Sequence, residues 1–399
     1  MSYQKHCPGC YAEKGGAAVC PACGYDESAE RSPLFLPHGI ILGGQYRVGR
    51  VLGKPGGFGI TYIGWDIHLQ QRVAIKEFMP RDLVSRSADS LEVRPHTDED
   101  RERFDLGKEQ FLREARIVAR FSHPNIVRVR AFFNANGTAY LVMDYYEGLS
   151  LGDYLSSVRN SMPPAVALGL IRPILEGLQF VHERDVIHRD LKPHNIYLAA
   201  EGRPILLDFG AALLSKGQHT NSLAVVLTEG YAPLEQYQKR SPQGPYTDVY
   251  GAAATLYRMI AGESPPMALD RLGYDPLQES GFVALPPGLR PVLAKALAVR
   301  PQDRYATAAE FLQALAEYRD EPDDNEGLAA VFKPLPAETA ARPTVEVSSS
   351  EATRIVLLDS VHAPPVPTSY ELPRRWKWVF AALAGLAFGE FLILLRLLF

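Results

Sequence analysis

The sequence has no excess of positive charge. Its 42 lysine and arginine residues are outnumbered by 46 aspartate and glutamate residues, which gives a formal net charge of −4. Nucleic-acid binding depends on neutralising phosphates, so this balance argues against a nucleic acid as the main partner. Hydrophobic residues make up 46% of the 399 positions, which excludes a chain that is disordered throughout. We therefore expect a globular protein of two or three domains.

Cysteine is scarce and confined to one end. All four cysteines lie within the first 23 residues, so the remainder must be held by a hydrophobic core, which a chain of this length can build. The same end has no apolar h-region, and we do not expect a secretory signal. Long apolar runs are also missing, apart from the last 21 residues. That absence excludes a protein that crosses a membrane many times.

The cysteines form two pairs with metal-ligand spacing. Cys7-Pro-Gly-Cys10 is followed, after nine residues, by Cys20-Pro-Ala-Cys23, and each pair makes a tight turn that can point both sulfurs inward. Four thiolates suit a closed Zn²⁺ site, and residues 1–28 resemble a zinc ribbon whose folding would depend on the metal. Two disulfides or a redox dithiol are the alternatives, although a reducing cytosol argues against the disulfides. We favour a structural or protein-docking role.

A glycine cluster lies between two stretches of alternating apolar residues. From Tyr46 the chain reads YRVGRVLGKPGGFGITYIGWDI, which predicts a strand, a glycine turn and a second strand. Glycines let backbone N–H groups approach a phosphate, but this pattern is equally consistent with a simple hairpin. Further on, Val73-Ala-Ile-Lys76 is a short buried strand that ends in a lysine.

A third group of residues makes the nucleotide interpretation specific. Residues 188–195 read HRDLKPHN, and residues 205–210 read ILLDFG. Phosphoryl transfer needs an acidic group that accepts the hydroxyl proton, a cation beside the γ-phosphate and oxygen ligands for Mg²⁺. Together with the glycine cluster and the lysine strand, these motifs resemble the eukaryotic-like protein kinase family over residues 46–318. The resemblance implies an α+β, bilobal protein-kinase fold, with a β-rich N-lobe at 46–147 and a helical C-lobe at 148–318.

The resemblance also implies a role for each matching position. Lys76 would hold the α- and β-phosphates of ATP, with Glu114 as its ion-pair partner. Asp190 would be the catalytic base, and Lys192 would lie beside the γ-phosphate. The implied Mg²⁺ ligands are Asn195 and Asp208. The other implied ATP-binding residues are Gly53, Gly56, Gly57, Gly59, the gatekeeper Met143 and the hinge residue Tyr145.

Further matches concern the residues that support the catalytic loop and the class of substrate. Asp248 resembles the aspartate that braces the catalytic loop, and Glu235 would pair with Arg304. The position of Lys192, two residues after the base, and Thr228 before Glu-Gly-Tyr-Ala-Pro match the serine/threonine branch rather than the tyrosine kinases. Thr228 as a simple turn residue remains the alternative. The implied partners are therefore proteins that carry serine or threonine hydroxyls.

Two features depart from the family pattern. Pro55 lengthens the first gap of the glycine loop by one residue, so the role of Gly53 is uncertain, while Gly56, Gly57 and Gly59 should still cover the phosphates. A segment rich in arginine and acidic residues, at about 77–108, separates the lysine strand from the Glu114 helix. We expect this segment to be a mostly exposed insert.

The carboxyl end differs in composition from the rest. Residues 319–375 contain eight prolines in 57 positions, which predicts a disordered linker. Residues 376–399 hold an apolar run of 21 residues, about 31 Å of helix, which is enough to span a bilayer. Basic residues before the run predict a single-pass anchor in the cell membrane, with the kinase domain in the cytoplasm. Glu390 is unfavourable at that depth and could mark self-association through the membrane helix; an amphipathic or core helix is the alternative.

We therefore interpret the chain as a membrane-anchored serine/threonine kinase that uses ATP and Mg²⁺ and carries a structural Zn²⁺. One alternative is a pseudokinase scaffold, which only the stretched glycine loop favours. The other is a protein whose zinc ribbon reads a partner or nucleic acid under the control of the kinase. In the family, an arginine at the position of Arg189 commonly pairs with a phosphorylated loop residue, so we predict phosphorylation of Thr220 or Ser222; polar loop residues without such a role are equally consistent.

Overall fold

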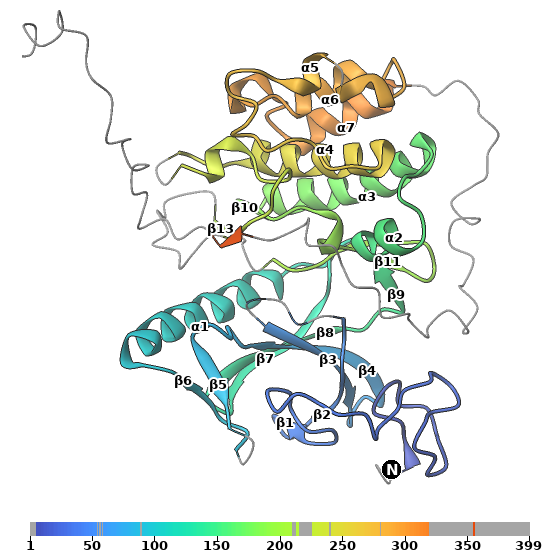
Figure 1. Ribbon diagram of the computed structural model, residues 1–399, viewed down its shortest axis with the longest axis vertical. Coiled ribbons are helices and arrows are strands. Elements are labelled where there is room, and N and C mark those ends of the chain that lie inside the picture. The colour runs from blue at the N-terminus through green and yellow to red at the C-terminus, as the bar shows by residue number, and fades with distance from the viewer. Residues whose placement is uncertain are drawn as a thin grey trace, which may run out of the picture. The chain divides into compact units, whose positions relative to one another are not determined.

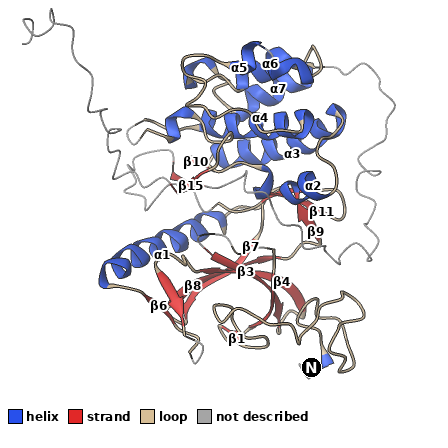
Figure 2. Cartoon of the chain, in the orientation of Figure 1, coloured by secondary structure: helices blue, strands red, loops and turns tan. Residues whose placement is uncertain are grey.

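The computed structural model describes residues 5–53, 55, 57, 59–87, 90–209, 213–214, 226–238, 241–279, 281–318 and 354–355. Within them a β-sheet with one long helix forms an N-lobe, and a group of helices forms a C-lobe (Figures 1 and 2). Two hydrophobic cores correspond to these lobes, one under the sheet and one between the helices. The two lobes match the predicted bilobal α+β arrangement, with a β-rich N-lobe and a helical C-lobe.

The N-lobe is built on a six-stranded antiparallel sheet with the strand order β1-β2-β3-β4-β8-β7. Its members are β1 (Ile41–Leu42), β2 (Tyr46–Val51), β3 (Gly59–Asp66), β4 (Gln71–Phe78), β7 (Val129–Ala135) and β8 (Thr138–Asp144). The sheet buries Tyr62, Ile75 and Tyr140 completely. Because β3, β4 and β8 pair over most of their length, the middle of β4 has a strand on each side.

Helix α1 (Asp98–Val118) lies against this sheet. It begins after Thr97, whose side chain accepts a hydrogen bond from the backbone of Asp100, and its first turn is acidic, which suits the positive end of a helix dipole. The ring of Phe104 stacks on Phe78 of β4, with 5.5 Å between the ring centroids. Leu112 and Ala115, on either side of Glu114, are buried too, so the helix packs on the lobe along most of its length.

The prediction that residues 77–108 form a mostly exposed insert is wrong for its first part. Strands β5 (Val84–Arg86) and β6 (Val93–Pro95) form a hairpin that buries Leu83 and the two valines. Arg86 is buried as well, where it pairs with Glu77, and its guanidinium donates to the carbonyl of Leu34 at 2.6 Å. Charge alone suggested exposure, but these charges neutralise each other inside the lobe.

The C-lobe is organised around α3 (Pro164–His182) and α4 (Pro245–Ala261). The other helices are α2 (Leu151–Ser157), α5 (Pro276–Glu279), α6 (Arg290–Ala296) and α7 (Ala308–Glu317). Four short 3₁₀ helices are η2 (Pro193–Asn195), η3 (Leu234–Gln236), η4 (Gly281–Ala284) and η5 (Pro301–Asp303). Because α3 and α4 are buried on several sides, they form a rigid base for the loops that precede and follow them.

Short strands carry the loops on the side of the C-lobe that faces the sheet. They are β9 (Gly148–Ser150), β10 (Val186–Ile187), β11 (Ile196–Ala199), β12 (Pro204–Leu206), β13 (Leu213–Leu214), β14 (Val226–Leu227) and β15 (Arg354–Ile355). Three of them form a sheet with the order β12-β11-β9, and β10 pairs with β13 and β14 with β15. The loop at 188–195 is therefore held between β10 and β11.

The predicted linker at 319–375, apart from residues 354–355, and the predicted membrane anchor at 376–399 lie outside the described residues. Within the described part, one helix, α3, is long and apolar enough to cross a membrane. Ile171, Ile174 and Leu175 of this helix are completely buried in the C-lobe. Its apolar character is thus that of a core helix.

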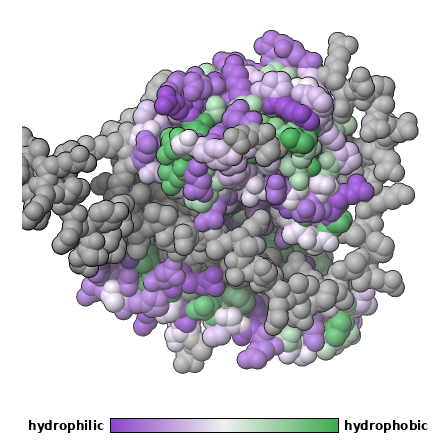
Figure 3. Space-filling view, turned by 45° about the horizontal axis from the view of Figure 1, so that its top comes forward, coloured by the Kyte–Doolittle hydropathy of each residue, from purple (hydrophilic) through white to green (hydrophobic). Residues whose placement is uncertain are grey.

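On the face shown in Figure 3, the described residues are mostly hydrophilic, with small hydrophobic groups scattered among them. Among the large apolar side chains of the C-lobe, Leu272, Tyr274 and Val283 are each more than half exposed.

Candidate active site

The predicted catalytic residues of the C-lobe contact one another. The side-chain amide of Asn195 donates to the backbone carbonyl of Asp190 at 2.7 Å and to its carboxylate at 2.9 Å. The Lys192 ammonium lies 2.9 Å from the same carboxylate and donates to the hydroxyl of Thr228, also at 2.9 Å. That hydroxyl lies 3.3 Å from the second oxygen of Asp190. These contacts hold a half-buried carboxylate beside a cation and a hydroxyl.

The backbone of this loop is held by Asp248, as predicted. Its carboxylate accepts hydrogen bonds from the backbone N–H groups of His188 at 2.8 Å and Arg189 at 2.7 Å. The ring of His182, at the end of α3, lies 2.7 Å from the same carboxylate. Burial raises the pKa of Asp248, but the hydrogen bond and charge of His182, with the N–H donors, hold that pKa below its usual value. Asp248 is therefore an anion that fixes the turn before Asp190.

The predicted pair between Glu235 and Arg304 is also made. The guanidinium donates two hydrogen bonds to the carboxylate, at 2.7 and 3.0 Å, and both side chains are buried. Arg304 also donates to the carbonyl of Ala298, and Thr247 of α4 donates to Glu235. This network ties the segment after Thr228 to the helices of the C-lobe.

The predicted metal ligands are brought together by the β11–β12 hairpin. Ile196 pairs with Leu206, and the N–H of Leu207 donates to the carbonyl of Asn195 at 2.8 Å. Asn195 and Asp208 therefore lie at the same end of the hairpin although 13 positions separate them. Carboxylate and amide oxygens are ligands that Mg²⁺ accepts.

Lys76 contacts Asp208 rather than Glu114. The lysine lies in the middle of β4, and its ammonium is 2.5 Å from the Asp208 carboxylate. Burial raises the pKa of Asp208, but the charge of Lys76 and its hydrogen bond lower that pKa below its usual value. The predicted ion pair between Lys76 and Glu114 is not made in this structure.

Glu114 is buried on α1 and accepts a hydrogen bond from Gln110 at 2.9 Å. Burial, together with the negative charge of Asp208, raises the pKa of Glu114 to about 8, although Gln110 and Lys76 act in the opposite direction. The side chain is thus mainly neutral at pH 7. This raised pKa accompanies the contact of Lys76 with Asp208, which leaves Glu114 without the ion pair that the resemblance implies.

The glycine loop connects β2 to β3. Gly53 has a φ of +65°, a conformation that favours glycine. At Gly59 an added Cβ would lie 2.6 Å from the carbonyl of Glu77, so only glycine permits this close pairing of β3 with β4. Gly57 has open space around its Cα, whereas Gly56 lies outside the described residues.

The predicted gatekeeper lies near the end of β8, and the hinge residue Tyr145 follows that strand. Met143 pairs with Ala74 in the sheet and packs on the C-lobe core. The guanidinium of Arg72 lies 5.2 Å from the centre of the Tyr145 ring. The next carbonyl, that of Tyr146, accepts a hydrogen bond from Tyr197 at 3.2 Å, which links the hinge to the C-lobe.

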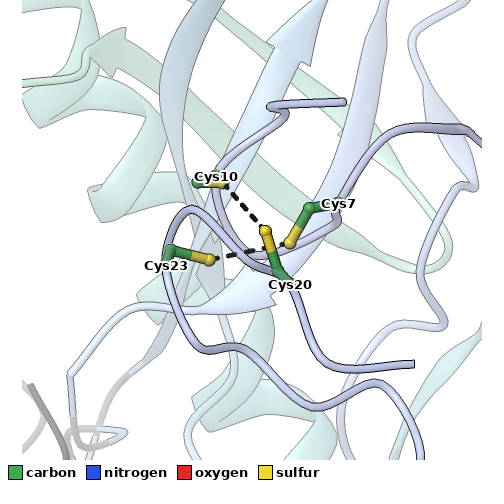
Figure 4. A group of neighbouring side chains, drawn as sticks. All are labelled: Cys7, Cys10, Cys20 and Cys23. Atoms are coloured by element: carbon green, nitrogen blue, oxygen red, sulfur yellow. Dashed lines mark hydrogen bonds between the residues drawn. The ribbon is translucent and has the colours of Figure 1, made fainter. Parts of the chain in front are cut away.

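The four cysteines of the N-terminal segment face a common centre (Figure 4). All four Sγ atoms lie within 4.8 Å of one another, with 3.7 Å between those of Cys7 and Cys23 and 3.8 Å between those of Cys10 and Cys20. A Zn²⁺ ion with bonds of about 2.3 Å needs sulfur atoms about 3.8 Å apart. The observed separations therefore fit a tetrahedral ion. The four described cysteines form no disulfide in this structure.

Sequence reasoning missed some of the supporting residues. His182 is separated from the motif at 188–195 by a turn, and no spacing rule identifies it as a partner of Asp248. Arg189 contacts Gln243, 54 positions away, at 2.5 Å. The predicted phosphorylation sites Thr220 and Ser222 lie outside the described residues.

Comparison with known proteins agrees with this geometry. The family model described as "Protein kinase domain" matches residues 46–313. The serine/threonine-protein kinase pkn2 of Myxococcus xanthus is 32% identical over 307 residues, which cover 71% of this chain and 33% of that protein. Serine/threonine-protein kinase PknL of Mycobacterium tuberculosis is 31% identical over 307 residues, covering 73% of this chain and 70% of that protein.

A solved structure is similar as well. The structure titled "PpkA-294 apo form" matches with a TM-score of 0.62 and 34% sequence identity, and the match covers 71% of this chain and 99% of the other. The chain spans well under half of some of its curated relatives, 33% of pkn2 and 42% of PknB from Mycobacterium leprae.

Proposed function

Because the chain belongs to the protein kinase family, we propose that it is a bacterial-type serine/threonine protein kinase that transfers the γ-phosphoryl group of ATP to protein hydroxyls. The contact set of Asp190, Lys192 and Thr228 carries this proposal. These three side chains lie within hydrogen-bonding distance of one another, which supports their proposed roles as base, cation and the threonine of the serine/threonine branch.

The chemistry follows from these side chains. The hydroxyl oxygen of the substrate forms a bond to the γ-phosphorus while the bond from that phosphorus to the β-phosphate oxygen breaks, and Asp190 receives the hydroxyl proton. Lys192 stabilises the negative charge on the transferred group. Asn195 and Asp208 would hold Mg²⁺, which neutralises phosphate charge when it is bound. Gly53, Gly56, Gly57, Gly59 and Lys76 would contact the phosphates of ATP, and Met143 and Tyr145 would contact the adenine.

Lys76 has two possible carboxylate partners in this scheme. In the structure it contacts Asp208, which is also the proposed metal ligand. Metal binding by Asp208 would release the lysine to the phosphates and to Glu114. We therefore propose that Glu114 forms its ion pair only in the nucleotide complex, when a positive charge arrives beside it.

The test is phosphate transfer from radiolabelled ATP by the full chain in detergent, with a general protein substrate and Mg²⁺. We expect label on serine and threonine after acid hydrolysis. Asp190→Asn keeps the shape of the side chain and should reduce the rate by at least about a hundredfold while ATP still binds. Nucleotide binding with equal, background-level labelling by both proteins would instead identify a pseudokinase scaffold.

We also propose that Cys7, Cys10, Cys20 and Cys23 hold one structural Zn²⁺. The sulfur separations support this, as does the backbone N–H of Gly9, which donates to the Cys7 sulfur at 3.1 Å. Metal analysis of the purified full chain should find one zinc ion for each chain. Zinc-free protein with the same melting temperature as protein supplied with zinc would contradict the assignment.

We further propose that residues 376–399 anchor the chain in the cell membrane as a single span, with the kinase domain in the cytoplasm. The apolar run of 21 residues and the basic residues before it support this proposal. Glu390 within the run supports self-association of the helices. Full-length protein should sediment with membranes, and a chain ending at Leu372 should not. Identical sedimentation of the two would overturn the anchor.

A further inference from the structure

The first cysteine turn docks directly on the strand that leads to the glycine loop. The backbone N–H of Arg50, on β2, donates to the carbonyl of Pro8 at 2.9 Å, and the Arg50 side chain donates to the carbonyl of Gly9 at 3.0 Å. Pro8 and Gly9 are the two residues between the first pair of cysteines. A bound metal would therefore fix the two carbonyls that Arg50 contacts.

The sheet is irregular at this point. The pairing of β2 with β3 shifts register between Val48 and Val51, and Arg50 donates its N–H to the cysteine turn. At Gly49 an added Cβ would lie 2.3 Å from the Pro8 carbonyl, so glycine permits the close approach. The cysteine turn thus substitutes for a strand partner where the sheet ladder is interrupted.

A second set of contacts involves Tyr11, the residue after the first cysteine pair. Its hydroxyl donates to the carbonyl of Arg47 on β2 at 2.8 Å, and its ring lies 5.4 Å from that of Trp65 on β3. The N-terminal segment is therefore attached to both strands that flank the glycine loop. Three positions after Arg50, that loop begins at Gly53.

We propose that the cysteine site is a positioning element for ATP binding: the metal holds residues 7–11, which hold β2 and with it the glycine loop. This inference rests on the proposed kinase function and Zn²⁺ site. Over residues 5–28 the described backbone forms tight turns and isolated β-bridges rather than long strands or helices, and the Tyr11 N–H donates to the Cys7 carbonyl at 2.7 Å across the first turn. A metal held by the four sulfurs would join this turn to the second one. Without the metal, the Arg50 N–H loses its partner and the end of β2 loosens.

The effect of metal removal should be confined to nucleotide binding, because the contacts around Asp190 are made elsewhere. The contacts of Asp190 with Lys192, Asn195 and Thr228 lie in the C-lobe and involve no residue of the N-terminal segment. Metal removal should therefore weaken ATP binding and leave the rate at saturating ATP nearly unchanged. A merely destabilising role would reduce that rate together with the affinity.

The experiment compares the full chain in detergent as purified, after chelation, and after zinc is returned. It measures zinc content, the KM for ATP, kcat and the Kd of a fluorescent ATP analogue. We expect chelation to raise the KM and Kd about tenfold with kcat changed less than about twofold, and zinc to restore both. Equal Kd values for the zinc-loaded and zinc-free proteins would overturn the inference.

A variant covers the case in which chelation unfolds the protein. Tyr11→Ala removes the contacts to Arg47 and Trp65 without touching a cysteine, and should raise the KM for ATP several-fold while one zinc remains bound. Val19→Ala is the matched control, because Val19 lies in the same segment and is 52% exposed; it should behave as wild type. Zinc-loaded Tyr11→Ala with wild-type KM would contradict the inference.

The two underlying proposals fail in distinguishable ways. Purified protein that never contains zinc would overturn the metal site, and this inference with it. Zinc-loaded protein that does not transfer phosphate would overturn the kinase, whatever the metal does.

Discussion

In the catalytic loop, Asp190, Lys192 and Asn195 already contact one another, whereas at the nucleotide end Lys76 and Glu114 do not. The first group is held by Asp248, a buried anion that receives two backbone N–H groups. The second depends on the position of α1 and on Lys76, which has Asp208 as a competing partner. The proposed base thus contacts its partners in the structure, whereas the proposed phosphate-binding pair does not.

Electrostatics accounts for the difference. Asp248 is ionised because His182 and the N–H groups of His188 and Arg189 surround its carboxylate. Glu114 is buried with one amide donor, and its raised pKa keeps it mainly neutral near pH 7. A buried carboxyl without a cation becomes neutral rather than remain charged. A ligand that moves Lys76 towards Glu114 would supply the missing charge.

The largest effect should come from a change at Asp248, whose carboxylate holds the backbone before Asp190. Asp248→Asn loses the negative charge that the N–H groups of His188 and Arg189 contact, so their hydrogen bonds weaken inside the lobe. We expect a loss of about 3 kcal/mol in unfolding free energy and a fall in kcat of about a hundredfold. Thermal unfolding and steady-state kinetics of the full chain measure both. Wild-type stability would show that the loop does not depend on this anion.

The protonation of Glu114 can be tested through the pH dependence of the free energy of unfolding. The pKa of Glu114 in the folded protein, about 8, exceeds the ordinary value of 4.5. Between these two pH values the folded protein keeps a proton that the unfolded chain releases. Stability from this group is complete below about pH 4.5 and is lost as the pH rises through 8. Between pH 5.5 and 7.5 the loss should be about 2 kcal/mol.

Glu114→Gln should remove this part of the pH dependence of thermal unfolding. The matched control is Glu109→Gln, because Glu109 is an exposed residue of the same helix; this variant should retain the wild-type slope. If Glu114→Gln keeps that slope too, Glu114 is ionised in the folded protein and its pKa is not raised.

The smallest effect should come from the hydroxyl of Thr228, which contacts both Lys192 and Asp190. Thr228→Val removes the hydrogen bonds to Lys192 and Asp190 and should reduce kcat about tenfold with little change in the KM for ATP. Thr228→Ser keeps the hydroxyl and should stay within about threefold of wild type. A Thr228→Val rate that equals or exceeds that of Thr228→Ser would show that the hydroxyl does not carry the effect.

The sequence predicts best where chemistry and support are close along the chain. Asp190, Lys192 and Asn195 are neighbours, and their motif could be recognised without the fold. The pairing of Glu235 with Arg304 was predicted from the family resemblance, because both ends match recognisable motifs. The four cysteines were identified from their spacing, which also brings their sulfur atoms together in the structure.

Contacts that depend on how separate elements pack could not be predicted. The partner of Lys76 depends on where α1 lies, and the burial of Arg86 depends on Glu77 and on the segment before β1. The docking of residues 7–11 on β2 was missed because the cysteine segment was treated as a separate domain. Nothing in the spacing of Pro8 and Arg50 indicates that one accepts a hydrogen bond from the other.

Hydrogen exchange of the full chain in detergent, with and without Mg²⁺ and a non-hydrolysable ATP analogue, tests the comparison most directly. Nucleotide should increase amide protection in α1 around Glu114 and in β2 up to the glycine loop. Residues 186–196, which are already assembled, should exchange at the same slow rate in both states. Equal increases in protection at the catalytic loop and at α1, or no change at α1, would contradict the view that only the nucleotide end awaits its ligand.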